Sequence, residues 1–206
     1  MEKQKTTTKY YTSDYERINL KIKNLFWYVV ERLSSNSNFI EKLYEKTVGV
    51  EYRKEINKFN LSKSKKILHI GCGSYPITAL ILAEINHIRV VAIDHNKKCV
   101  KIARKVLEQK NMNGKISAEL GEGLNYPLKG FDTIITSGGV QPNIQVINHI
   151  LKNSEKKCKI IIREAYYKDK IIKNIIENSG DVELINKINN HAFKTSDWDS
   201  YYIIKN

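Results

Sequence analysis

Two glycines, Gly71 and Gly73, form the first chemically informative pattern in the sequence. They follow a short apolar run, 66–70, and an apolar helical pattern begins directly after them. Glycine lets the backbone turn tightly and approach a ligand that a Cβ atom would keep away. The order of strand, glycine turn and helix is typical of the opening unit of a nucleotide-binding α/β domain. It therefore predicts a nucleoside site, whereas the alternative is a tight turn that holds no ligand.

A carboxylate stands at the end of the next apolar run. Asp94 follows 90–93, about 20 residues beyond the glycine turn. An acidic side chain at that strand end can accept hydrogen bonds from both ribose hydroxyls of an adenosine. The combination of strand, turn, helix and acid makes a nucleoside ligand a stronger prediction than the glycines alone.

Proline occupies the place of the third glycine of the dinucleotide fingerprint. Pro76 lacks an N–H group, and Tyr75 crowds the same turn. A pyrophosphate is bound by free N–H groups at the start of a helix, whereas proline is well tolerated in a first helical turn. The turn therefore argues against NAD and FAD and favours a ligand without phosphate, such as S-adenosylmethionine.

These residues carry a resemblance to a known family. Ile70-Gly71-Cys72-Gly73 followed by Ile93-Asp94 resembles motifs I and II of class I S-adenosylmethionine-dependent methyltransferases, over about residues 65–165. The finer pattern Tyr75-Pro76-x-Thr78 is similar to the branch that includes nicotianamine synthase and staphylopine synthase. Members of that branch transfer the aminocarboxypropyl arm of S-adenosylmethionine instead of its methyl group.

The resemblance implies a set of cofactor residues just past the strands. Gly71, Gly73 and the 74–78 turn would hold the methionine end, Asp94 the ribose, and Glu122 the adenine edge. The full set of expected cofactor residues is Gly71, Cys72, Gly73, Tyr75, Pro76, Thr78, Asp94, His95, Glu122, Gly123, Ser137 and Gly138.

Catalytic groups are harder to assign. Glu164, after the fifth strand, is a candidate general base for an amine or hydroxyl acceptor, or else an ion-pair partner of Arg163 or a nearby lysine. Tyr11, before the first helix, is a candidate to close over a bound ligand and take part in catalysis. The five histidines match no metal-binding spacing, so we expect no metal. Group transfer from a sulfonium needs mainly proximity and alignment.

The remaining chain repeats strand and helix. Apolar runs predict strands at 66–70, 89–94, 115–120, 131–136 and 159–163, then a final pair near 182–188 and 200–205. Unbroken apolar strands suit a parallel sheet covered on both faces. With the resemblance, this implies a Rossmann-like α/β fold with seven strands in the order 3-2-1-4-5-7-6 and the last strand antiparallel.

Residues 1–62 are expected to form a short helical cap, and residues 63–206 the α/β domain. A helix over 14–33 has one apolar face, made of Ile18, Ile22, Leu25, Val29 and Leu33. A second helix follows from 39, and Gly49 is expected to end or kink it. We expect these helices to pack on the sheet. The cap is short for the nicotianamine synthase branch, which opposes aminocarboxypropyl transfer.

The composition of the chain limits the kinds of partner and the cellular setting that we expect. The chain has 206 residues and a formal net charge of +13, which favours acidic partners, RNA included. The basic residues are spread along the chain without an RNA-binding signature, so a small-molecule acceptor is favoured over nucleic acid. No apolar run is long enough to cross a membrane. No export signal is seen and the three cysteines form no close pair, so we expect a cytoplasmic protein with reduced thiols.

The sequence thus predicts an S-adenosylmethionine-dependent methyltransferase acting on a small molecule. One alternative is aminocarboxypropyl transfer of the nicotianamine or staphylopine synthase type. Another is a non-catalytic module that binds S-adenosylmethionine or RNA, because no catalytic group is firmly assignable. The sequence carries no information on oligomeric state.

Overall fold

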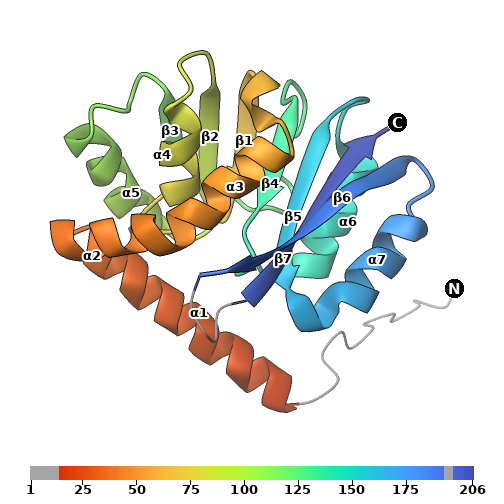
Figure 1. The fold of residues 1–206 in the computed structure, drawn as a ribbon, viewed down its shortest axis with the longest axis horizontal. Helices are drawn as coiled ribbons and strands as arrows, with labels where there is room; N and C mark the ends of the chain where they lie inside the picture. Colours follow the sequence, from red (N-terminus) through yellow and green to blue (C-terminus); the bar gives the residue numbers. More distant parts are fainter. Residues whose placement is uncertain (1–13, 193–196) are drawn as a thin grey trace, which may run out of the picture.

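The computed structural model describes residues 14–192 and 197–206, which form one sheet between two layers of helices (Figure 1). The seven strands take the order β3-β2-β1-β4-β5-β7-β6, as predicted. Their bounds are β1 Lys66–Ile70, β2 Arg89–Asp94, β3 Ile116–Leu120, β4 Thr133–Thr136, β5 Lys159–Ala165, β6 Val182–His191 and β7 Asp197–Lys205.

Strands β3, β2, β1, β4 and β5 are parallel, and β7 runs antiparallel to both β5 and β6. Strand β4 is buried along its whole length, and β1 and β5 are buried beyond their first residue. Such strands read as continuous apolar runs because helices cover both faces of a parallel sheet. The carboxyl ends of β1, β2, β4 and β5 therefore meet at one edge, where ligands bind in folds of this kind.

Two helical layers complete the core. Helices α4 (Ile77–Ala83) and α5 (Lys97–Gln109) pack on one face, and α6 (Asn143–Asn153) and α7 (Asp169–Glu177) on the other. Each layer contributes its own buried cluster against the sheet, so the sheet separates two apolar cores. Asn96 caps α5 by accepting a hydrogen bond from the Lys98 amide at 2.9 Å.

The second part of the cap joins the α4–α5 core. It runs from α2 (Asn38–Tyr44) through a π-helical turn η1 (Glu45–Gly49) into α3 (Val50–Lys58), and the 3₁₀ turn η2 (Leu61–Lys63) leads to β1. Tyr44, Val48, Ile56 and Phe59 are buried in the same cluster as α4 and α5. These helices pack on the α/β part as expected, and the boundary at residue 62 stays a prediction.

Helix α1 (Asp14–Ser34) differs from the expectation. Its apolar stripe faces outward: Ile22 is 60% exposed and Leu25 62% exposed. The opposite side faces the sheet edge with Lys23, Asn24 and Glu31. Helix α1 therefore covers the sheet edge with its polar side, and its apolar face does not take part in this packing. The physical reason is that α1 lies over a cavity at the strand ends, and the cavity takes polar and aromatic side chains.

No helix among the described residues is long and apolar enough to cross a membrane. The three cysteines are unpaired and buried.

Candidate active site

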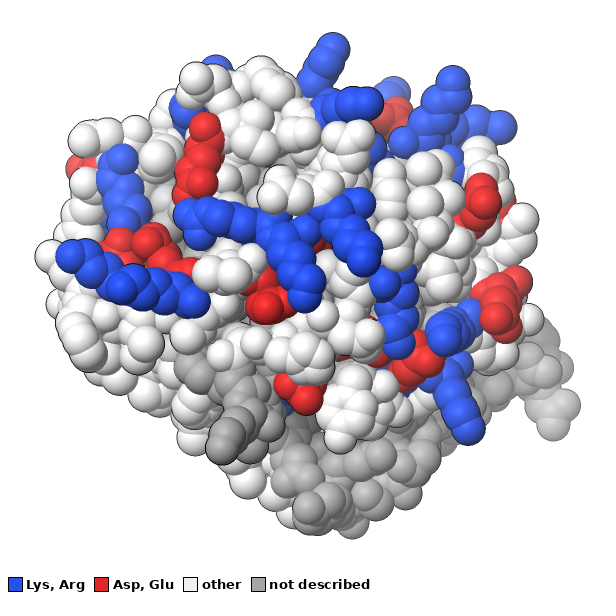
Figure 2. All heavy atoms as spheres, in the orientation of Figure 1, with Lys and Arg blue, Asp and Glu red and all other residues white. Residues whose placement is uncertain are grey.

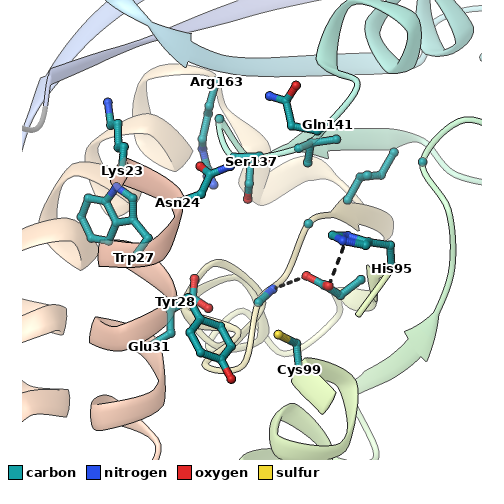
Figure 3. Close-up of a pocket in the computed structure, with 18 of the residues that line it drawn as sticks. Lys23, Asn24, Trp27, Tyr28, Glu31, His95, Cys99, Ser137, Gln141 and Arg163 are labelled. Atoms are coloured by element: carbon teal, nitrogen blue, oxygen red, sulfur yellow. Dashed lines mark hydrogen bonds and ion pairs between the residues drawn. The ribbon is translucent and has the colours of Figure 1, made fainter. Parts of the chain in front are cut away.

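A cavity of about 290 Å³ lies at the carboxyl edge of the sheet, roofed by α1 (Figure 3). In this view Asn24 extends from α1 toward Ser137, Lys23 and Trp27 lie beside it on the same helix, and His95 and Cys99 lie on the opposite side. The loops after β1, β2, β3, β4 and β5 all contribute to its lining. The fold therefore brings together loops that are far apart in sequence, at the place where doubly wound sheets bind ligands.

The glycine turn after β1 forms the floor of this cavity. Gly71 has φ +82° and Gly73 has φ +67°, a backbone region that side chains other than glycine rarely adopt. A Cβ on Gly71 would lie 2.5 Å from Val140 Cγ2, and one on Gly73 would lie 2.0 Å from Glu31 Oε2. Both positions thus require glycine on account of backbone conformation and close approach.

Asp94 reaches this turn from the end of β2. Its Oδ2 atom accepts a hydrogen bond from the Gly73 amide at 2.9 Å, and its Oδ1 atom accepts one from the Asn96 amide at 2.8 Å. The His95 Nδ1 atom lies 3.7 Å from Oδ1. Each carboxylate oxygen still has acceptor capacity, so Asp94 can organise the turn and bind two hydroxyls at once.

Glu31 is the unexpected member of the site. This α1 residue accepts a hydrogen bond from the Ser74 amide at 2.9 Å, so it joins the roof to the glycine turn. Burial raises the pKa of Glu31 to about 8, and the negative charge of Asp94 adds to the rise. At neutral pH the side chain is mainly protonated, and it ionises just above neutrality.

His69 lies beneath the cavity within β1. It is only 2% exposed, and its Nε2 atom is 2.9 Å from Ser137 Oγ, which lines the cavity. Burial lowers the pKa of His69 to about 3, with a smaller effect from the charge of Arg163. A ring that stays neutral at physiological pH and is covered by Ser137 is best explained as a structural support of the cavity floor.

Glu164 follows the same edge at the end of β5. Its Oε1 atom accepts the Ala165 amide at 2.9 Å and pairs with Lys168 Nζ at 3.2 Å, while Asn143 donates to its other oxygen. The side chain lies in the cavity wall but is 2% exposed. Its lysine partner is Lys168, whereas Arg163 pairs elsewhere. A role as general base stays a prediction.

Arg163 is the centre of a buried polar cluster that ties the cap to the sheet. Its Nη2 atom donates to Glu55 Oε1 of α3 at 2.6 Å, and its Nη1 atom donates to Thr78 Oγ1 at 2.8 Å. The guanidinium also lies over the ring of Tyr52, 3.8 Å from its centroid. Removal of either partner of a buried ion pair strongly destabilises the fold, because the other charge is left unpaired. The pair therefore fixes α3 against β5.

Comparison with known proteins assigns this architecture. Residues 55–167 match the family described as Methyltransferase small domain, which spans more than half of the chain. The chain belongs to the methyltransferase small domain family. Membership confirms the predicted cofactor, S-adenosylmethionine, and the class I Rossmann-like fold. No curated protein matches the sequence significantly.

Solved structures similar to this family member include a nicotianamine synthase and a methyltransferase. A variant of the nicotianamine synthase MtNAS has a TM-score of 0.71 at 15% identity, and the match covers 94% of this chain and 78% of that chain. MtNAS in complex with S-adenosylmethionine has a TM-score of 0.67 at 17% identity, with 93% and 75% covered. A putative sarcosine dimethylglycine methyltransferase from Galdieria sulphuraria has a TM-score of 0.59 at 9% identity, with 75% and 83% covered. At these identities the likeness shows the fold.

The site residues of this methyltransferase-family protein fit the cofactor. A carboxylate with free acceptor capacity ends β2, and glycines line the walls on several sides. Of the residues predicted to bind it, eight line the cavity: Gly71, Gly73, Asp94, His95, Glu122, Gly123, Ser137 and Gly138. Their individual roles stay predictions.

The other four predicted residues lie outside the cavity lining. Tyr75 is 1% exposed, packs against Tyr44 and directs its hydroxyl to Glu45 at 3.3 Å. Thr78 is engaged by Arg163, and Cys72 and Pro76 are also buried away from the lining. Cys72 and all residues from Ser74 to Thr78 are buried, which the spacing alone did not reveal. Tyr11 lies outside the described residues.

Sequence reasoning missed the contribution of α1. Lys23, Asn24, Trp27, Tyr28 and Glu31 recur at helical spacing on one side of the helix and line the cavity. Burial lowers the pKa of Lys23, while the charge of Glu164 opposes this effect. The sequence signal for this contribution was the polar and aromatic face of α1, which lies opposite its apolar face. Within the described residues no cluster of side chains could hold a metal ion.

Proposed function

We propose that this protein transfers a methyl group from S-adenosylmethionine to a small-molecule acceptor. The observation that carries the proposal is the roof that α1 forms over the carboxyl edge of the sheet. Glu31 joins α1 to the Ser74 amide, and Asn24 Nδ2 lies 3.4 Å from the Gly139 carbonyl oxygen at the other side. A cavity closed in this way favours a small acceptor over a macromolecule.

The surface supports the same choice. Figure 2 shows basic side chains scattered across the viewed face with acidic ones between them. A nucleic-acid substrate would favour a continuous basic path leading to the cavity. Buried, unpaired cysteines suit the cytoplasmic setting expected from the sequence.

The roles proposed for the residues follow from their positions. When bound, S-adenosylmethionine supplies a carbon activated by its sulfonium. Asp94 would hold the ribose, the glycine turn the methionine end, and Glu122 the adenine edge. Trp27 and Tyr44, whose ring centroids are 6.0 Å apart, would exclude water at the roof. Glu164, which Lys168 and Asn143 hold in the wall, would act as the general base that takes a proton from the acceptor.

Aminocarboxypropyl transfer is the second candidate, and two observations favour it. The likeness to MtNAS covers 93–94% of this chain and so includes the cap, whereas the Galdieria methyltransferase match covers 75%. The helical cap therefore resembles that of the nicotianamine synthase branch more than its short length suggested. In addition, Glu31 occupies the Ser74 amide, one of the groups expected to hold the methionine end. If Glu31 displaces the methionine arm from this amide, the arm carbon next to the sulfonium, and not the methyl carbon, would face the acceptor.

The nucleoside product distinguishes the two reactions. The protein is incubated with S-adenosylmethionine and a small-molecule extract, and nucleosides are followed by mass spectrometry. S-adenosylhomocysteine is expected for methyl transfer. Methylthioadenosine in its place would show that the protein transfers the aminocarboxypropyl group and not the methyl group. Binding of S-adenosylmethionine without either product would support the non-catalytic alternative.

Asp94→Asn tests the cofactor site itself. The variant should weaken S-adenosylmethionine binding at least tenfold, because hydrogen bonds to a charged acceptor contribute about 1.5–3 kcal/mol. Asp181→Asn, which changes an exposed carboxylate paired with Lys205, is the matched control. Calorimetry measures both affinities. An unchanged affinity for Asp94→Asn would mean that the carboxylate does not contact S-adenosylmethionine.

A further inference from the structure

The outward face of α1 is an unpartnered apolar stripe. Among the described residues, no element covers Ile18, Ile22, Leu25, Phe26, Val29 and Leu33, which are 45–62% exposed. Scattered exposed apolar residues are ordinary, whereas a contiguous row marks an interaction site. This row is called the α1 stripe below.

We propose that the α1 stripe is the interface between two copies of this chain, paired through antiparallel α1 helices. The proposal is independent of which group the active site transfers.

The spacing of the stripe suits another helix. Ile18, Ile22, Leu25, Val29 and Leu33 follow one another at intervals of four and three residues along a 21-residue helix. Apolar residues at such intervals form the narrow seam by which helices pack against helices. The seam is about 22 Å long at 1.5 Å per residue, which is enough for two or three interlocking layers.

The stripe is also complementary to itself. A two-fold axis passing between Leu25 and Phe26 places Ile18 opposite Leu33 and Ile22 opposite Val29. Every apolar position then meets another apolar position, as an isologous interface requires. The antiparallel arrangement also pairs the two helix dipoles favourably.

The exposed area is close to what a stable dimer needs. Phe39 is 75% exposed and Leu43 47% exposed on the adjoining α2. With the six residues of the stripe they would expose on the order of 700 Å², compared with about 800 Å² per partner in a standard interface. The stripe and its extension onto α2 can therefore supply most of a specific interface.

A membrane surface fits the stripe less well. A helix that lies on a membrane combines its apolar face with rows of Lys and Arg beside it. Among the α1 side chains that the structure describes, Lys21 and Arg32 are the exposed basic ones, and Lys23, Asn24 and Glu31 line the cavity. The net charge of +13 makes two copies repel, so added salt should strengthen the dimer.

Sedimentation equilibrium of the full chain tests the proposal. The expected species has twice the 23.9-kDa chain mass, with a dissociation constant of about 10 μM or lower. Leu25→Glu should raise this constant at least a hundredfold, because it places a charge in the centre of the seam. Ile185→Glu, at a position 44% exposed on the edge strand β6, is the matched control and should change it less than about threefold.

Leu25 is exposed, so the Glu variant should keep its circular dichroism spectrum and its affinity for S-adenosylmethionine. A monomer at about 100 μM, or a dimer that Leu25→Glu does not weaken, would overturn the proposal. A monomer that co-sediments with phosphatidylglycerol vesicles, and that loses this binding in Leu25→Glu, would also overturn the proposal.

Cysteine pairs test the direction of packing, since all three native cysteines are buried. A mixture of Ile18→Cys and Leu33→Cys proteins should form the mixed disulfide under mild oxidation. Crosslinks between two Ile18→Cys chains, without the mixed product, would indicate parallel helices and reject the antiparallel interface.

Discussion

Helices α1 and α5 have similar sequence patterns and opposite environments. Both carry apolar residues at intervals of three and four. In α5 that face is buried, with Val100, Ala103, Val106 and Leu107 each at most 3% exposed. In α1 the apolar face is exposed and the polar face lines the active-site cavity. Periodicity therefore identifies a helix with two faces, but the surroundings decide which face lies inside.

The largest effect that distinguishes the two helices is on stability. Leu107→Ala in α5 should lower the free energy of unfolding by about 2–5 kcal/mol, because it leaves a cavity in a close-packed core. Leu25→Ala in α1 should change it by less than about 0.5 kcal/mol, measured at a concentration where the chain is monomeric. Urea unfolding measures both. Equal losses would mean that α1 is buried in solution as firmly as α5.

The inner face of α1 should show an effect that depends on pH. Glu31 has a pKa of about 8 in the folded chain and an ordinary value of 4.5. Between these values the carboxyl ionises in the unfolded chain but stays protonated in the folded one. The free energy of unfolding should therefore fall as pH rises from about 4.5 to 8.

Glu31→Gln removes this titration. The variant should gain about 2–4 kcal/mol over the parent between pH 5 and pH 8, allowing for partial access of water. Unfolding in urea at both pH values measures the gain. If parent and variant change in parallel with pH, Glu31 titrates normally and the inner face of α1 is well hydrated.

The smallest effect concerns the far end of the roof. Asn24→Ala removes a long hydrogen bond, 3.4 Å, to the Gly139 carbonyl oxygen. We expect a loss of about 0.5 kcal/mol in stability and a two- to threefold rise in KM for S-adenosylmethionine, because neutral hydrogen bonds contribute little. Steady-state kinetics measures the rise. A large fall in kcat would instead mean that Asn24 contacts the reacting groups.

The sheet was predictable because its strands are short apolar runs separated by glycine and polar turns. The order of all seven strands agrees with the resemblance in motifs I and II. The glycine turn and Asp94 were predictable because their chemistry is local: a positive φ angle and a carboxylate at a strand end.

Contacts between distant residues could not be predicted in this way. Arg163 and Glu55 are 108 positions apart, and neither sequence neighbourhood indicates the other. Glu31 meets Ser74 across 43 positions, and only the folded roof brings its carboxyl to the glycine turn. The inward direction of Tyr75 likewise depends on the packing of α2 and η1 around the turn, and that of Thr78 on Arg163 of β5.

The ion pair of Glu55 and Arg163 has a consequence for where the chain tolerates substitutions. The family match begins at Glu55, which is also the first residue of the cap to be joined to the sheet by a buried charge. Substitutions from that residue onward are constrained by the interior. Helix α1, which precedes the family match, contributes one wall of the cavity and exposes its apolar face. We therefore expect substitutions on the exposed face of α1 to disturb the buried core less than substitutions at Glu55 or Arg163.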